Sequence, residues 1–179
     1  MQTIETKRLR LREFRFQDAS DVFEYAKRED VGPFAGWKPH TNIEETEKIV
    51  AGFIASGDVW AMELKDNQKV IGSIGLHKDE LRKKLNSKSI GYVVSPLFKN
   101  KGYAKEAVLA LLEHAFFQQK IDMVSGYHFP NNYASKRVLL ACGFTYEGTI
   151  KNAIKLHDGQ LTDRSCYIIE KEKFIHVHD

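Results

Sequence analysis

The chain has 179 residues, with 27 lysines and arginines against 24 aspartates and glutamates and a formal net charge of +3. This length suits one domain with a sizeable core, and the balanced charge argues against nucleic acid or an anionic membrane as a partner. No apolar run reaches the roughly 18 residues of a membrane-spanning helix, and the first residues lack the apolar core of a signal peptide. Cys142 and Cys166 are too few for a disulfide framework. We expect a cytoplasmic protein, monomer or homodimer, with one domain over residues 1–179 and reduced thiols.

The first part of the chain predicts a strand, a helix and an irregular segment. Residues 8–12 alternate arginine with leucine, which indicates a half-buried strand with its three arginines on a solvated face. Asp18 is the expected N-cap of a helix whose apolar face includes Val22 and Phe23. Residues 29–41 combine two glycines and two prolines with aromatic side chains, so both local packing and a role as a pocket wall stay open.

A capped helix and a hairpin follow. Asn42 and Glu45 form a capping-box-like start for a helix over residues 43–56, and Gly57 ends it. Strands are expected over Val59–Leu64 and Lys69–Leu76, joined by a polar turn, and residues 78–88 form a charged surface loop.

The central stretch, residues 89–104, reads as a buried strand, a short loop and the start of a long helix. Pro96 ends the strand, and apolar residues at helical spacing predict a helix over residues 104–117. Free N–H groups and the dipole at a helix N-terminus favour an anion, glycine lets the backbone approach it, and Lys99 and Lys101 add charge. From the loop composition alone, a phosphate site and an ordinary connection both stay open.

The last third predicts another strand and a short helix. Residues 123–128 form the strand. Asn131 or Asn132 caps the helix, and Gly143 is its left-handed stop.

Two of these segments together resemble a known family. Residues 99–104, Lys-Asn-Lys-Gly-Tyr-Ala, resemble the Gln/Arg-x-x-Gly-x-Gly/Ala motif of the GNAT superfamily of acyl-CoA-dependent N-acetyltransferases. Lys99 stands where Gln or Arg is usual, and Asn100 where glycine is frequent. Asn132-x-x-Ser135 followed by Gly143-Phe144 is similar to the second acetyl-CoA motif of the family. The resemblance covers roughly residues 4–170, and further residues match the Rim-type branch, the ribosomal-protein N-terminal acetyltransferases: Thr6, Arg8, Leu9, Leu11, Arg12, Glu147, Gly148, Asp158, Gly159, Asp163 and Tyr167.

The resemblance implies an α/β (α+β) fold of GNAT type. Its central sheet has six or seven mostly antiparallel strands and is flanked by helices. The sheet splays between strands 89–95 and 123–128, and the helix 104–117 packs on it. The implied activity is transfer of an acetyl group from acetyl-CoA to a primary amine, by direct attack in a ternary complex.

The resemblance also implies roles for particular residues. The backbone of Val93 and Val94 receives the pantetheine arm and the acyl carbonyl. Ser135 is the candidate acid, serving by a hydrogen bond to the thioester sulfur, because Leu139 stands where many relatives have a tyrosine. Further contacts to acetyl-CoA are assigned to Asn132 and to the loop residues Lys99, Asn100, Lys101, Gly102, Tyr103 and Ala104.

The general base and the acceptor stay open. Ile154 stands where some Rim-type enzymes have a glutamate, so the candidates are His77, His128, Glu63 or water; His77 is our first choice because neutral imidazole suits proton removal. A protein N-terminal amine is the preferred acceptor. A small-molecule amine such as a polyamine or aminoglycoside, and a non-catalytic acyl-CoA-binding module, are the alternatives.

Overall fold

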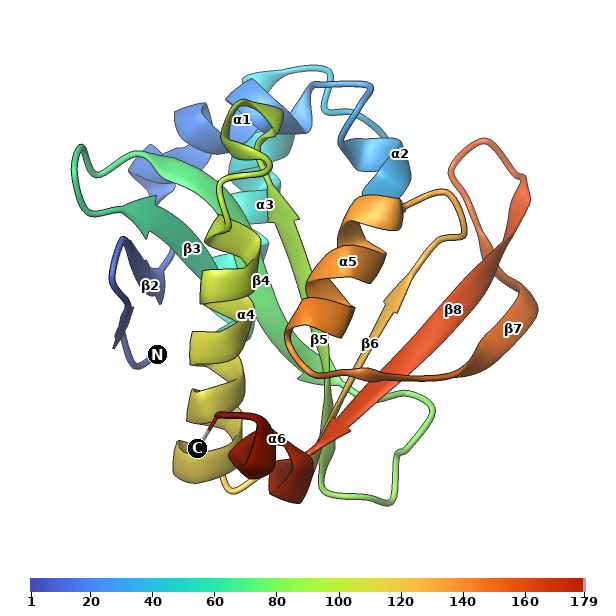
Figure 1. Ribbon diagram of the computed structural model, residues 1–179. Helices are drawn as coiled ribbons and strands as arrows, with labels where there is room; N and C mark the ends of the chain where they lie inside the picture. The colour runs from blue at the N-terminus through green and yellow to red at the C-terminus, as the bar shows by residue number, and fades with distance from the viewer. Residues whose placement is uncertain (179) are drawn as a thin grey trace. The chain divides into compact units, whose positions relative to one another are not determined.

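The computed structural model describes residues 1–178, with side chains through residue 174. One sheet of eight strands has the order β1-β2-β3-β4-β5-β6-β8-β7, and helices flank it (Figure 1). The pairs β1–β2, β2–β3, β3–β4, β6–β8 and β7–β8 are antiparallel, whereas β5 and β6 run parallel. The predicted fold class is thereby confirmed. The sheet exceeds the expected six or seven strands because Ile4–Glu5 adds the short edge strand β1.

The chain packs as two compact units. The first comprises Met1–Gly75 with Tyr92–Ala107, and the second comprises the rest of the chain. Three elements, β4 (Val70–Lys78), β5 (Ser87–Val94) and α4 (Tyr103–Glu113), pass from one unit into the other. The expectation of a single domain stays a prediction.

The first unit has its core between helices and strands. Phe14, Val22, Tyr25, Val50 and Val59 belong to one buried cluster. Its other elements are β2 (Leu9–Glu13), η1 (Phe16–Asp18), α1 (Ala19–Ala26), α2 (Gly32–Ala35), α3 (Ile43–Ser56), β3 (Val59–Leu64) and η2 (Pro96–Phe98).

Helix α3 confirms the sequence prediction. Asn42 Oδ1 accepts a hydrogen bond from Glu45 N at 2.9 Å, and Gly57 ends the helix in the left-handed region with φ 62°. The Glu45 carboxylate accepts a hydrogen bond from Thr41 N at 2.8 Å, whereas in a capping box it would accept from the N–H of the N-cap residue, Asn42. Residues 29–41 pack locally, since Trp37 lies against the core cluster and His40 N donates to Ala26 O.

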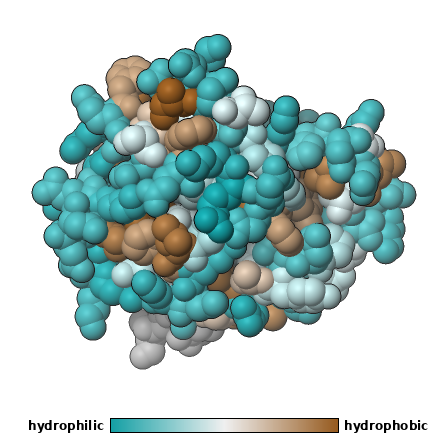
Figure 2. Space-filling view, turned by 90° about the horizontal axis from the view of Figure 1, so that it is seen from above, coloured by the Kyte–Doolittle hydropathy of each residue, from teal (hydrophilic) through white to brown (hydrophobic). Residues whose placement is uncertain are grey.

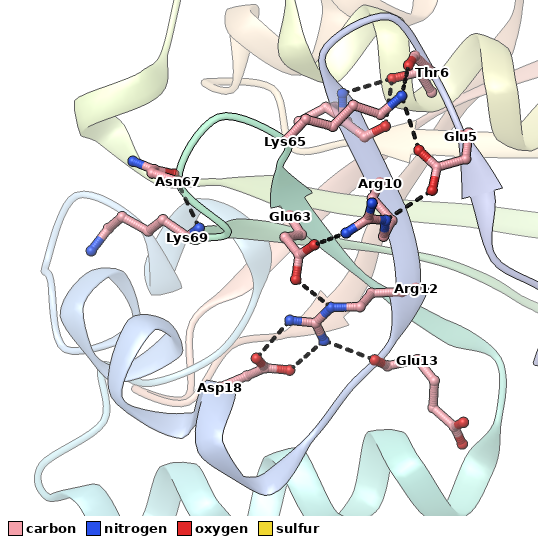
Figure 3. Close-up of polar contacts among 11 residues, drawn as sticks. Glu5, Thr6, Arg10, Arg12, Glu13, Asp18, Glu63, Lys65, Asn67 and Lys69 are labelled. Atoms are coloured by element: carbon pink, nitrogen blue, oxygen red, sulfur yellow. Dashed lines mark hydrogen bonds and ion pairs between the residues drawn. The ribbon is translucent and has the colours of Figure 1, made fainter.

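The structure around the arginines of β2 contradicts two predictions, one about the exposure of Arg12 and one about Asp18 as an N-cap (Figure 3). Arg12 is buried, at 5% exposure, and its guanidinium binds Glu63 at 2.6 Å and Asp18 at 2.8 Å. Arg10 binds the other oxygen of Glu63 at 2.8 Å. The expectation that all three arginines are solvated is therefore wrong for Arg12, because β3, which pairs with β2, is buried along its whole length. Asp18 likewise makes no side-chain cap to α1; its carboxylate is occupied by Arg12 and by Arg15 N.

The second unit holds the C-terminal half of the sheet. It contains β6 (Met123–His128), α5 (Tyr133–Ala141), β7 (Thr145–Lys155), β8 (Leu161–Glu170) and α6 (Lys171–His178). The predicted bounds of β6 are confirmed. The helix expected over residues 104–117 is α-helical to Glu113 and continues as a π-helical turn, η3 (His114–Gln118), in which Gln119 N donates to His114 O.

The face of the protein that Figure 2 shows is mainly polar. Hydrophilic residues predominate on it, and apolar residues form separate small patches. Among the residues that the structure describes, no helix is long and apolar enough to cross a bilayer.

Candidate functional site

The end of strand β5 is held close to β4. Ser95 N donates to Ile71 O at 2.7 Å, and a side chain at Gly72 would place its Cβ 2.2 Å from Val93 O. Glycine at position 72 therefore permits the close approach of the two backbones. Val93 and Val94, the expected carbonyl and pantetheine residues, are the last residues of β5.

The loop of residues 99–104 has the backbone that its composition favours. Asn100 and Gly102 both lie in the left-handed region, with φ 61° and 82°, which asparagine and glycine tolerate best. Glu106 N makes a helical hydrogen bond to Gly102 O at 3.0 Å. The N–H groups of Tyr103 and Ala104 thus lie in the first turn of α4, before Glu106 N, which is the first donor of the helical hydrogen bonds. Lys99, Asn100, Lys101 and Gly102 are exposed.

An ion pair that the sequence did not predict fixes this loop to the start of the chain. Arg8 Nε lies 2.7 Å from Glu106 Oε2, and Arg8 Nη1 donates to Lys101 O at 2.8 Å. The Arg8 guanidinium also lies 4.3 Å from the centroid of the Tyr103 ring. Thr6 Oγ1 and Arg8 N both donate to Glu106 Oε1, at 2.6 and 2.7 Å. The only hint in the sequence is an acidic residue in the first turn of a helix.

These contacts set the charge of Glu106. Burial by itself would raise the pKa of its carboxyl, but the hydrogen bonds from Thr6 and Arg8 and the charge of Arg8 lower it below its ordinary value. Glu106 is therefore an anion at neutral pH that holds the Arg8 guanidinium at the loop.

In the second unit, the motif Asn132-x-x-Ser135 lies at the start of helix α5. Asn132, rather than Asn131, is the N-cap, and its Oδ1 accepts from Ser135 N at 3.1 Å. Gly143 ends the turn with φ 88°, as expected. Ser135 is partly exposed in the first turn. Leu139 is buried against β6, where a Cβ at Gly126 would lie 2.9 Å from Leu139 Cδ2.

Two of the candidate general bases, His128 and Glu63, already use their polar side-chain atoms in contacts within the protein. His128 is buried, with Nδ1 2.7 Å from Phe129 O and Nε2 3.2 Å from Tyr167 Oη. Both oxygens of Glu63 are bound by arginines. His77 is exposed on β4, and its ring lies beside Gly91, where an added Cβ would be 3.6 Å from Nε2. The geometry therefore disfavours His128 and Glu63 as proton acceptors, and His77 stays a prediction.

The tail residues of the resemblance have structural partners. Asp163 accepts from Asn152 N at 3.0 Å and from Lys151 Nζ at 2.8 Å, which stabilises the left-handed Asn152, φ 50°, at an irregularity in β7. Gly159 turns the β7–β8 hairpin with φ 87°. Ile154 lies opposite Thr162, so no carboxylate stands at that position.

Comparison with known proteins assigns this chain to a family. The acetyltransferase (GNAT) domain family matches residues 8–145. The chain is 29% identical to the uncharacterized N-acetyltransferase YoaA of Bacillus subtilis over 175 residues, covering 95% of this chain and 97% of YoaA. It is 30% identical to the uncharacterized N-acetyltransferase YnaD of the same organism over 169 residues, covering 94% of this chain and 98% of YnaD.

Solved structures agree. A GNAT-family acetyltransferase from Bacillus anthracis superposes with a TM-score of 0.87 at 29% identity, covering 96% of this chain and 99% of the other. The fold is shared at lower identity with two more enzymes. A ribosomal-protein-S5-alanine acetyltransferase from Vibrio fischeri has a TM-score of 0.80 at 19% identity, covering 97% of this chain and 99% of the other. The microcin C7 self-immunity acetyltransferase MccE, solved with acetyl-CoA and AMP, has a TM-score of 0.77 at 20% identity, covering 92% and 93%. The chain belongs to the GNAT family of acetyltransferases.

Proposed function

We propose that the protein transfers an acetyl group from acetyl-CoA to a primary amine by direct attack in a ternary complex. The observation that carries this proposal is the loop of residues 99–104, where the left-handed Gly102 precedes the free N–H groups of α4. A side chain at Gly102 would stand where an anion approaches the backbone, so glycine fits a pyrophosphate there. Acetyl-CoA supplies the activated acetyl thioester.

The remaining roles in catalysis are assigned to particular residues of the chain. A main-chain N–H group of the Val93–Val94 segment donates to the acyl oxygen, where negative charge develops. The Ser135 hydroxyl donates a hydrogen bond to the sulfur as it leaves. Asn132 fixes the first turn of α5 that carries Ser135, as its cap to Ser135 N supports. His77 accepts the proton of the amine, for which an exposed imidazole is suited.

The preferred acceptor is a protein N-terminal amine. The Rim-type motif residues of the tail and the shared fold with a ribosomal-protein acetyltransferase support it. A polyamine or aminoglycoside acceptor is the first alternative. The second alternative is an acyl-CoA-binding module without turnover. Leu139 and Ile154 support it, because neither side chain can donate or accept a proton.

Release of CoA from acetyl-CoA tests these alternatives over a panel of amines. We expect peptides with a free N-terminus to accelerate release, and the same peptides with a blocked N-terminus to leave it unchanged. Faster release with a polyamine or aminoglycoside would favour the first alternative. Binding of acetyl-CoA without acceleration by any amine would favour the module.

A further inference from the structure

In the second unit, the sheet face opposite α5 carries an arginine. Directly paired residues of antiparallel strands share a face, and so do residues two apart on one strand. Gly126 of β6 faces Leu139 of α5, whereas its neighbour Tyr127 points to the other side. Tyr127 pairs with Cys166 of β8, so Arg164 lies on the same face as both.

One nitrogen of the Arg164 guanidinium has an unfavourable environment. This atom, Nε, is buried and, among the described residues, has no hydrogen-bond partner. Its Cζ lies 4.0 Å from the centroid of the Tyr127 ring, and that tyrosine is 37% exposed. A buried charged donor without an acceptor is unfavourable, so this geometry favours an acceptor from outside the protein. Stacking on Tyr127 holds the guanidinium plane in one orientation, which suits a carboxylate with two oxygens.

The charged side chains nearby pair with one another. Arg82 binds both Asp79, at 3.3 Å, and Glu147, and Lys151 binds Asp163 at 2.8 Å. The guanidinium of Arg164 is a cation that attracts a carboxylate, whereas a polyamine or an aminoglycoside would bring further cations against it.

We propose that Arg164, stacked on Tyr127, binds a carboxylate of the acceptor, so that the preferred substrates are primary amines that also carry a carboxylate. The proposal rests on the function proposed above. It narrows the acceptor class. Helix α5 covers the other face of this part of the sheet, and on the Arg164 face Tyr127 is 37% exposed, so a substrate can reach the guanidinium beside that ring. Two sources supply this chemistry: a free amino acid and a peptide with an acidic side chain.

Calorimetric titration with matched pairs tests the proposal and separates the sources. The small-molecule pair is β-alanine and its amide, and the peptide pair is Ala-Glu and Ala-Gln, both with amidated C-termini. The carboxylate member of the recognised pair should bind about tenfold more tightly, because a charge-assisted hydrogen bond is lost in the amide. If the carboxylate compound binds more tightly than its amide in only one of the two pairs, that pair shows whether the acceptor is a free amino acid or a peptide.

Variants assign the preference to Arg164. Arg164→Gln should abolish it, and Arg164→Lys should keep the charge but only part of the preference, because lysine lacks the planar fork. Lys171→Gln is the matched control, since it also removes a cation from an aromatic ring, that of Phe117 at 5.6 Å. A thermal melt confirms that each variant is folded.

The outcomes separate this proposal from the proposed function. Titrations are made with and without CoA, and failure of CoA itself to bind contradicts the acetyl-CoA-dependent function. If neither pair shows a carboxylate preference in either condition, or if the preference survives in Arg164→Gln, the carboxylate site is excluded.

Discussion

Arg8 and Glu106 bind each other across 98 positions of sequence, with Nε and Oε2 2.7 Å apart. The pair fastens the segment before β2 to the first turn of α4. The same guanidinium also holds the carbonyl of Lys101. The loop proposed to bind pyrophosphate is therefore fixed by a contact to a distant part of the chain as well as by its own turn.

Replacing Glu106 should weaken the first unit in a pH-dependent way. Because the pKa of Glu106 is lowered in the folded state, its contribution is fully present above the ordinary glutamate pKa and is lost as pH falls through the lower folded value. Glu106→Gln should lose about 1–2 kcal/mol of unfolding free energy at neutral pH, given several hydrogen bonds to one charged group. The difference from the parent protein should shrink in acid. Denaturant unfolding across pH measures it, and Glu113→Gln, an exposed glutamate of the same helix, should show little change.

The buried ion cluster around Arg12 should be sensitive to loss of one partner. Glu63→Ala leaves Asp18 as the one carboxylate that pairs with Arg12 among the described residues, and removing one member of a buried pair costs roughly 3–5 kcal/mol. Glu5→Ala removes an exposed partner of Arg10 and should cost under about 1 kcal/mol. Chemical denaturation of both variants compares them. Equal, small effects would show that the cluster contributes little to stability.

The two asparagine caps allow a matched comparison. Asn132→Ala and Asn42→Ala each remove a side chain that accepts from the third residue of a helix, so each should cost about 1 kcal/mol in stability. Thermal melts should therefore move by similar amounts. Only Asn132→Ala should also weaken acetyl-CoA binding, and equal affinities in the two variants would remove Asn132 from the site.

The Ser135 hydroxyl should act on turnover rather than on binding. A donor used only in the transition state contributes roughly 2–4 kcal/mol, by analogy with oxyanion-hole donors. Ser135→Ala should thus slow kcat and kcat/KM together by about a hundredfold, at near-normal acetyl-CoA affinity. Steady-state kinetics with an acceptor from the amine panel measures the change, and Ser135→Thr, which keeps a hydroxyl, should recover part of the rate. Turnover at the parent rate in Ser135→Ala would make the hydroxyl structural.

The features that the sequence predicted well depend on local signals. The bounds of α3 follow from Asn42 and Gly57, which act within one turn of the helix ends. The bounds of β3 and β6 follow from short apolar runs between polar turns. The left-handed backbone at Gly102 and the Asn132 cap have the same local origin.

The features that it missed depend on partners distant in sequence. Alternation in β2 shows which residues share a face, but not that Glu63, 51 positions away, receives Arg12 in the interior. The same limit hid the pair of Arg8 and Glu106, which are 98 positions apart. The π-helical turn after Glu113 has no proline or glycine to mark it.

Calorimetric titration of acetyl-CoA into Gly102→Glu tests the central claim most directly. The added carboxylate occupies the phosphate position and repels the anion, so binding should be abolished. Gly159→Glu is the control, because it introduces the same side chain at a similar left-handed φ, 87° against 82°, in the β7–β8 turn. The account predicts that Gly159→Glu binds acetyl-CoA as the parent protein does, and that Gly102→Glu does not although its melt shows a folded protein. Unchanged affinity in Gly102→Glu would contradict the assignment of the loop of residues 99–104 as the acetyl-CoA site.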